Sequence, residues 1–335
     1  MTAVSILNRL VMAAITLFGV AVIVFCLLRI VPGDPIAMMI SPGASPADIA
    51  ALRAHYGLDA SLPVQFGLWL RAVLSGDFGT SISLRRDVLE LLSERLPATL
   101  ELAFAALFLG VLGGGLIATI ATLLRRTPAE SLLDIVNGLF LAVPDFVWAL
   151  VLVLAFGVFF PVFPLSGRID PNLTAAFATP FYLLESLATL RFALFADILS
   201  HMIMPMLALG LPLAAVIART LKEALLEAMV QDYVLLARLK GMSQLRLVLQ
   251  EALRNAIGPT LTLTGVQFTF MIGGTVIVER IFSYPGIGNM AIDAVINRDL
   301  PLIQGLVLVF GALFIVINIV VDMLATLFNP RIAHG

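Results

Sequence analysis

The sequence predicts an all-α membrane protein with six transmembrane helices. Three observations support this fold class: the composition, the length of the apolar stretches and the placement of basic residues between them. Of the 335 residues, 60% are hydrophobic and only 13% are charged, and the mean hydropathy is +1.05. Soluble domains contain about 45–50% apolar and about 25% charged residues. A chain of this composition needs lipid as part of its solvent.

Six apolar stretches are long enough to cross the hydrocarbon core of a bilayer, which takes about 20 residues. They are Leu10–Ile30, Leu102–Leu124, Leu132–Phe160, Met202–Ala218, Thr260–Val278 and Leu302–Leu327. The chain thus divides into an N-terminal transmembrane helix (1–30), an extracytoplasmic segment (31–96) and a five-helix core (97–330). Six crossings place both termini on the same side of the membrane.

Basic residues between the spans predict the orientation. The loop 219–256 contains the largest set, which is Arg219, Lys222, Arg238, Lys240, Arg246 and Arg254. In the segment 31–96, by contrast, acidic residues outnumber basic ones. Because Lys and Arg are enriched in cytoplasmic loops, we expect the loop 219–256 and both termini to lie in the cytoplasm.

Several kinds of chemistry find no support in the sequence. Neither lysine follows a glycine in the phosphate-binding pattern G-x-x-x-x-G-K-[ST], so we expect no ATP hydrolysis by this chain. The three histidines are scattered and the only cysteine is Cys26, which argues against a metal site and a disulfide. A net charge of −2 gives no reason to expect nucleic-acid binding. We therefore predict no catalytic residues, metal ligands or cofactor on this chain.

Two polar residues inside the spans are candidates for a transport pathway. Asp145 follows Pro144 in the third stretch, where an acid could meet a cationic group such as a peptide amine. The alternative interpretation of Asp145 is an acid near a kinked helix end, where it is paired with a neighbour or hydrated. Gln267 is a lone amide in the fifth stretch, and it could equally bridge two helices.

The loop "DYVLLARLKGMSQLRLVLQEALRNA" has the pattern of two amphipathic helices joined at Gly241. Leu245, Leu249, Ala252 and Ala256 are predicted to form the apolar face of the second helix, with Ser243 as its N-cap. Such an element can dock into a groove on another protein. The alternative is an amphipathic linker that lies on the lipid surface.

This loop, extended as "DYVLLARLKGMSQLRLVLQEALRNAIGP", resembles the cytoplasmic loop of ABC-importer permeases of the dipeptide/oligopeptide/nickel branch. The likeness covers nearly the whole chain, through "LLRIVPGDPI", "LSGDFGTSI", "ERLPATLELA", "HMIMPMLALGLP", "VIVERIFSYPGIG" and "NRDLPLIQGLVLV". Some positions depart from the family pattern. Leu235 and Leu236 precede Ala237-Arg238 where arginine or threonine is frequent, and Glu251 replaces a common histidine.

The resemblance implies a type I ABC importer permease with a MetI-like core, in a bacterial or archaeal plasma (inner) membrane. It implies a second similar permease (a heterodimer), two ABC ATPase subunits that bind ATP and Mg²⁺, and an extracytoplasmic binding protein that delivers the substrate. The residues it assigns to ATPase coupling are Tyr233, Ala237, Arg238, Lys240, Gly241 and Met242. It assigns the outer gate, or contact with the binding protein, to Phe282, Pro285, Gly286 and Gly288.

A secondary transporter coupled to an ion gradient, acting without an ATPase, is the alternative function. The few ionisable residues inside the spans argue against it, because such carriers use buried charges to bind the coupling ion. The substrate stays open between dipeptides, longer peptides, opine-like conjugates and nickel complexes. Whether the two permeases are identical stays open as well.

Overall fold

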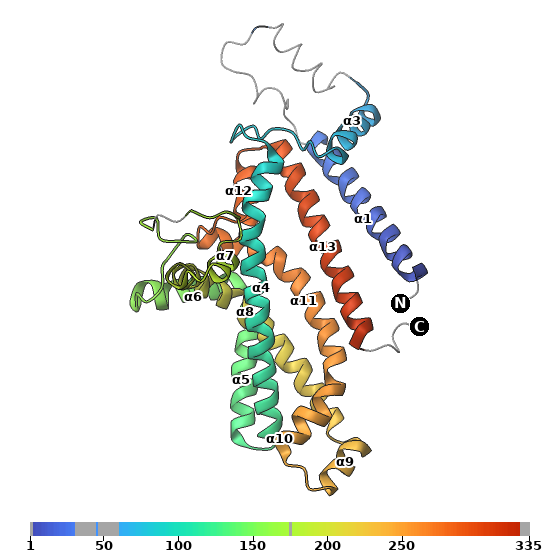
Figure 1. Cartoon of the computed structure of the whole chain (residues 1–335), viewed down its shortest axis with the longest axis vertical. Helices are drawn as coiled ribbons and strands as arrows, with labels where there is room; N and C mark the ends of the chain where they lie inside the picture. Colours follow the sequence, from blue (N-terminus) through green and yellow to red (C-terminus); the bar gives the residue numbers. More distant parts are fainter. Residues whose placement is uncertain (1–2, 31–44, 46–59, 174–175, 329–335) are drawn as a thin grey trace. The chain divides into compact units, whose positions relative to one another are not determined.

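The computed structural model describes residues 3–30, 45, 60–173 and 176–328, and within these ranges the regular structure is helical (Figure 1). Most of the predicted extracytoplasmic segment before residue 60, and the C-terminus after residue 328, lie outside the described residues. The elements are α1 (Ala3–Ile30), α3 (Leu62–Leu74), α4 (Val88–Leu123), α5 (Pro128–Ala142), α6 (Asp145–Leu152), η1 (Val153–Phe159), α7 (Tyr182–Ala188), α8 (Phe192–Ala228), α9 (Asp232–Leu239), α10 (Gln244–Arg246), η2 (Leu247–Ala252), α11 (Leu253–Ile281), α12 (Ile287–Ile296) and α13 (Leu300–Phe328).

The chain forms two compact units. Unit 1 consists of Met1–Leu96 with Met290–Ile315, and unit 2 consists of Pro97–Asn289 with Val316–Gly335. The long helices α4 and α13 each contribute residues to both units.

In the described part of the chain, five helices are long and apolar enough to cross a membrane. They are α1, α4, α8, α13 and the helix that runs from Gln244 to Ile281. Each contains one of the predicted apolar stretches, except that α4 ends at Leu123, one residue before the predicted end of its stretch. Several are longer than the predicted spans, with 36 residues in α4 and 37 in α8, so they extend beyond the thickness that about 20 residues cover.

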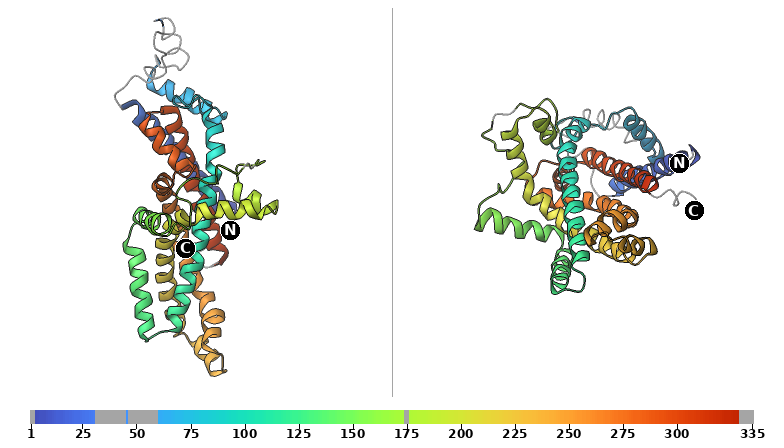
Figure 2. Two further views of the ribbon diagram at one scale, coloured as in Figure 1. Left: turned by 90° about the vertical axis from the view of Figure 1, so that its left-hand side faces the viewer. Right: turned by 60° about the horizontal axis from the view of Figure 1, so that its bottom comes forward.

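The predicted span Leu132–Phe160 is not one straight helix. It consists of α5 and of α6 with η1, and the two parts are bent by 102° at the intervening break (Figure 2). Val143 is extended, with φ −97° and ψ 123°, and Pro144 follows it. A residue before proline is pushed out of the helical region, and proline has no N–H to continue the hydrogen-bond ladder. Counted as one broken span, the pair is the sixth candidate span among the described residues.

Unit 2 is built around α8, the most buried of the five long apolar helices, because 67% of its apolar stretch lies inside the protein. Helices α11, α5 and α6 all pack against it. Lys222 on α8 forms ion pairs with Glu130 and Asp134 on α5, at 2.8 and 2.7 Å. Lys222, which contributes to the predicted orientation through its charge, thus also fixes α5 on α8.

In unit 1, a buried carboxylate joins the start of α13 to the turn that precedes α4. Asp299 Oδ2 accepts hydrogen bonds from the Ser81 hydroxyl at 2.6 Å and from the N–H and hydroxyl of Ser83 at 2.9 and 2.7 Å. Burial alone would raise the pKa of the Asp299 carboxyl, but the bonds from Ser81 and Ser83 hold its pKa below the ordinary value of 3.8.

This lowered pKa makes the stability of the protein depend on acid pH. A group whose pKa is lower in the folded state stabilises it at pH values above the ordinary pKa, and that contribution is lost as the pH falls through the folded value. We expect the thermal midpoint of the wild type to fall more steeply below about pH 4 than that of Asp299→Asn. Differential scanning fluorimetry across pH checks this. The exposed Asp77→Asn is the control and should follow the wild type; equal slopes for all three proteins would contradict the prediction.

Candidate functional site

The predicted docking element is a compact helical corner at the end of unit 2 where α4 turns into α5 (Figures 1 and 2). The first part of the predicted loop 219–256, up to Ala228, belongs to α8, and its last part belongs to η2 and α11. The segment that connects the two long helices is therefore Met229–Ser243, and α9 is its only regular element.

Gly241 makes the turn after α9. Its φ is +82°, in the left-handed region, and a Cβ at this position would meet no atom within 4 Å. The N–H groups of Gly241 and Met242 close the turn by donating to the carbonyls of Arg238 and Ala237, at 3.0 and 3.3 Å. Glycine is needed here for its backbone conformation and not for lack of space.

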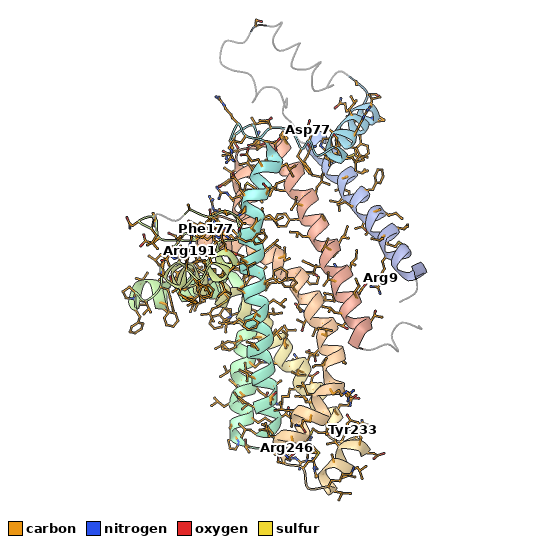
Figure 3. All side chains as sticks on the ribbon, in the orientation of Figure 1. Arg9, Asp77, Phe177, Arg191, Tyr233 and Arg246 are labelled. Atoms are coloured by element: carbon orange, nitrogen blue, oxygen red, sulfur yellow. The ribbon has the colours of Figure 1, made fainter. Side chains whose placement is uncertain are left out.

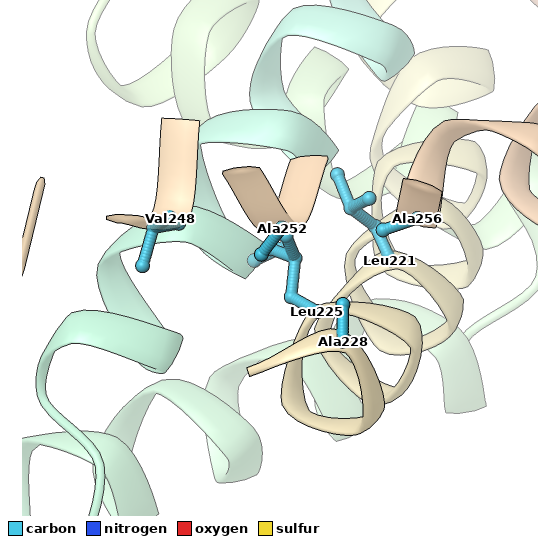
Figure 4. Packing of buried hydrophobic residues seen from close by; sticks show 7 residues of the cluster. Leu221, Leu225, Ala228, Val248, Ala252 and Ala256 are labelled. Carbon is cyan, nitrogen blue, oxygen red and sulfur yellow. The ribbon is translucent and has the colours of Figure 1, made fainter. Parts of the chain in front are cut away.

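The inner face of α9 is small and apolar. Val234 and Ala237 are 0% and 7% exposed and pack with Leu247, while Met242 packs partly against the same cluster. A second cluster fixes the base of the corner on α8 and α4 (Figure 4). It comprises Ala118, Leu221, Leu225, Ala228, Val248, Ala252 and Ala256. Among the predicted coupling residues, Ala237 and Met242 thus hold the corner in place from inside.

The outer face of α9 presents leucines together with charged residues. Leu235, Leu236 and Leu239 are 51%, 55% and 78% exposed. Tyr233, Arg238, Lys240 and Gly241 are exposed as well. Figure 3 shows Tyr233 on α9 and Arg246, the last residue of α10, in this corner. Leucines this exposed beside the basic residues Arg238 and Lys240 form a surface of the kind that suits a protein groove.

The predicted apolar face of the second helix is wrong at two positions. Leu245 and Leu249 are 51% and 45% exposed, whereas Leu247 and Val248 are 1% exposed. The reason is that Leu247–Ala252 forms a π-helical turn, in which the α-helical spacing does not apply. Ser243 does occupy the N-cap position, but its side chain makes no capping hydrogen bond.

The two predicted pathway residues lie on neighbouring helices of unit 2. Asp145 is the first residue of α6, at the bend, and its carboxylate lies against Gly274 of α11. It is partly buried, and its Oδ1 accepts the N–H of Phe146 at 2.8 Å. Gln267 is partly buried on α11, and within the described part of the chain its amide has no hydrogen-bond partner.

The predicted gate residues belong to a buried turn between α11 and α12. Phe282 is 1% exposed, and both Gly286 and Gly288 are buried. A Cβ on Gly286 would meet the carboxylate of Glu279, and one on Gly288 would lie 2.7 Å from the Cα of Val276. The two glycines are therefore required by close approach to α11.

The sequence alone did not single out Glu279 or Arg168, two charged residues that hold this region together. Glu279 is 0% exposed and accepts the Thr99 hydroxyl at 2.6 Å. Glu101, two residues further on α4, forms a buried ion pair with Arg168 at 2.7 Å. The Arg168 guanidinium also lies 4.0 Å from the centre of the Tyr182 ring. Acids at the ends of apolar stretches are the only signal in the sequence that could have indicated these residues.

A buried phenol lies in the same region. Tyr284 is 0% exposed, and burial raises the pKa of its hydroxyl, so the phenol stays neutral. Among the described residues, no group of three His, Cys, Asp or Glu side chains is placed to hold a metal ion. The described part of unit 2 is thus a helical bundle with exposed leucines at the corner around α9 and a buried polar network.

Comparison with known proteins decides which family this is. The family model for the binding-protein-dependent transport system inner membrane component matches residues 92–334, and the model for its N-terminal part matches residues 3–103. The chain belongs to this family. It is an ABC importer permease, a multi-pass protein of the inner membrane that works with an ATPase and a substrate-binding protein.

Three relatives illustrate the likeness. The permease is 38% identical to the di/tripeptide transport system permease protein DppB of Pseudomonas aeruginosa, over 98% of each chain. It is 35% identical to the probable peptide ABC transporter permease protein y4tP of Sinorhizobium fredii, over 98% of this chain and 99% of that one. It is 37% identical to the glutathione transport system permease protein GsiC of Salmonella paratyphi A, over 98% of each.

A solved structure supports the fold. A chain of the inward-facing MetNI methionine ABC transporter matches with a TM-score of 0.51 at 14% identity, covering 72% of the permease and 97% of that chain. The predicted MetI-like permease fold is therefore confirmed. The family also favours ATP-driven import over the ion-coupled alternative, which no comparison supports.

Proposed function

We propose that this permease imports peptides, with di- and tripeptides as the first candidates. The support comes from its relatives, which are permeases for di/tripeptides and for glutathione, itself a tripeptide. The chain matches each of these relatives over 98% of its length. Asp145 and Gln267 are the proposed pathway contacts, the carboxylate for the peptide amine and the amide for the peptide backbone.

For energy coupling, the proposal uses the outer face of α9. Leu235, Leu236 and Leu239 insert into a groove of the ATPase, and Arg238 and Lys240 flank them. The exposure of these leucines beside basic side chains is the observation that favours this role. A short helix in a groove transmits force because apolar anchors and charges fix its register.

The proposed assembly contains a second, similar permease and two ATPases. ATP and Mg²⁺ bind to the ATPases, and this chain hydrolyses none, since its sequence has no phosphate-binding loop of the Walker type. The corner at α9 and both termini face the cytoplasm. The turn with Phe282, Pro285, Gly286 and Gly288 then lies toward the outer side, where the binding protein delivers its substrate.

A pull-down tests the docking surface. We expect wild-type permease, tagged and extracted in mild detergent, to co-purify with an ATPase and a second permease. Leu239→Glu should lose the ATPase by about tenfold or more, because it places a charge in an apolar groove. Leu74→Glu is the matched control, since Leu74 is 80% and Leu239 78% exposed. An unchanged ATPase yield with Leu239→Glu would contradict docking through α9.

Uptake by proteoliposomes tests the substrate class. With the complete importer and its binding protein, we expect ATP-dependent uptake of a labelled dipeptide that unlabelled di- and tripeptides inhibit. Uptake that needs ATP but ignores peptides would leave the permease assignment standing and overturn the peptide proposal.

A further inference from the structure

The turn between α11 and α12, residues 282–289, is held by two side chains that are not among the predicted site residues. Glu279 precedes the turn on α11, and Thr99 lies on α4. The turn itself is buried, with Phe282, Tyr284 and Ile287 at 1%, 0% and 0% exposure. These contacts lie entirely within unit 2.

Hydrogen bonds to Glu279 and Thr99 hold the turn. Its Oε1 accepts the Thr99 hydroxyl at 2.6 Å, and its Oε2 accepts the N–H of Asn289 at 2.9 Å. The Thr99 oxygen in turn accepts the N–H of Ile287 at 2.9 Å. The backbone carbonyl of Glu279 accepts the N–H of Tyr284 at 2.8 Å. Three backbone N–H groups of the turn thus end on Glu279 and Thr99.

The charge of Glu279 suits this position. Ile287 begins α12, and the first N–H groups of a helix have no partner within the helix. A carboxylate near a helix N-terminus is also favoured by the helix dipole. Gly286 allows the contact, since a Cβ there would meet the same carboxylate.

A second connecting segment is held on the same part of α4. Glu101 accepts from the Arg168 guanidinium at 2.7 Å and from the N–H of Leu184 at 3.0 Å. The N–H of Gly167 donates to the carbonyl of Phe282 at 3.0 Å, which joins this segment to the turn. Thr99 and Glu101, less than one helical turn apart, therefore fix both segments to α4.

We propose that Glu279 and Thr99 are positioning residues for transport, which lock the turn 282–289 onto α4 so that it moves with α4 and α11. A lid that opens alone has few buried contacts and exposed backbone hydrogen bonds. This turn has the opposite properties. Movement of α4 and α11, driven by ATP at the other end of unit 2, then carries the turn with it and couples the rim of the pathway to the ATPases. The inference rests on the proposed function, which places the turn at that rim.

The test measures the ratio of peptide taken up to ATP hydrolysed by the complete importer in proteoliposomes. Thr99→Val keeps the size of the side chain but removes the hydroxyl that both donates and accepts. We expect its ratio to fall about fivefold or more, with ATP hydrolysis retained. Thr99→Ser, which restores the hydroxyl, should give the wild-type ratio.

Thr275→Val is the matched control. Thr275 is 0% exposed on α11, and its hydroxyl bonds only to the carbonyl of Ile272 on its own helix, at 2.7 Å. Both valine variants remove one buried hydroxyl. If Thr99 had a purely structural role, the two variants would lose protein yield equally and keep the wild-type ratio of peptide taken up to ATP hydrolysed. A wild-type ratio for Thr99→Val, or an equal fall for Thr275→Val, overturns the inference.

A spin label provides a second readout if Thr99→Val yields little protein. The exposed Ser283→Cys in a Cys26→Ser background places the label on the turn. Glu279→Gln replaces one carboxylate oxygen, which accepts a hydrogen bond, with an N–H₂ group, which cannot accept one. We therefore expect this variant to increase the mobility of the label. Unchanged mobility overturns the inference. Failure of the proposed function looks different, because then the wild-type importer itself shows no ATP-dependent uptake.

Discussion

Gly241→Val is expected to abolish most ATP-driven uptake while the permease stays folded. The φ of Gly241 is +82°, and a β-branched residue in the left-handed region is a rare outlier. The strain is roughly 1–2 kcal/mol, which changes the population of the native turn by a factor of about 5–30. The turn can relieve the strain only by giving up its bonds to Arg238 and Ala237, and α9 then loses its orientation.

Gly76→Val is the matched control for this experiment. Gly76 has φ +90° and open space around its missing Cβ, as Gly241 does, but it belongs to unit 1. Both variants introduce the same kind of strain. We expect only Gly241→Val to lose ATPase co-purification and uptake, measured on equal amounts of monodisperse protein. Similar uptake by the two variants would show that the turn after α9 has no role in coupling.

Arg168→Met is expected to give the largest loss of stability. The side chains of Arg168 and Glu101 are 5% and 3% exposed, so removing the guanidinium leaves a buried carboxylate without its counter-charge. Breaking such a pair costs about 3–5 kcal/mol. The loss should appear as a fall of several degrees in the thermal midpoint of the purified protein. The double variant Arg168→Met/Glu101→Gln should recover much of it, because the uncompensated charge is gone while Gln can still accept the N–H of Leu184.

Arg86→Met is the control for arginine removal in general. Arg86 pairs with Glu90 and Glu94 at 2.7 and 2.6 Å, but its side chain is 42% exposed, and ion pairs in water contribute little. We expect no measurable change in its thermal midpoint. A loss equal to that of Arg168→Met would mean that burial does not distinguish the two pairs.

The corner around α9 shows how far a local pattern can be trusted. Leucines and basic residues around Gly241 predicted a two-helix element with a sharp turn, and the structure has α9, a turn at φ +82° and a following helix. The same pattern assigned Leu245 and Leu249 to the buried face, and both are exposed. Periodicity assumes regular α-helical geometry, and the π-helical turn over Leu247–Ala252 changes which residues face inward.

The span around Asp145 shows a second limit. Apolar length predicted one crossing over Leu132–Phe160, and the proline within it was visible in the sequence. The size of the bend, 102°, and the place of Asp145 against Gly274 depend on how α5 and α6 pack on α8 and α11. Local sterics fix where the helix breaks, whereas its neighbours fix where each half goes.

The sequence alone determined that lipid is part of the solvent of this protein, which stretches are apolar enough to cross it, and to which family the chain belongs. The first follows from the composition of the whole chain and the last from many local motifs in order, and each apolar stretch can be read within a window of about 20 residues. The tertiary structure alone decided which polar and charged side chains contact one another. Thr99 and Glu279 are separated by 180 positions, and Glu101 and Arg168 by 67. No spacing rule relates residues so far apart, because their contact depends on how whole helices are packed and on the need to pair every buried polar group.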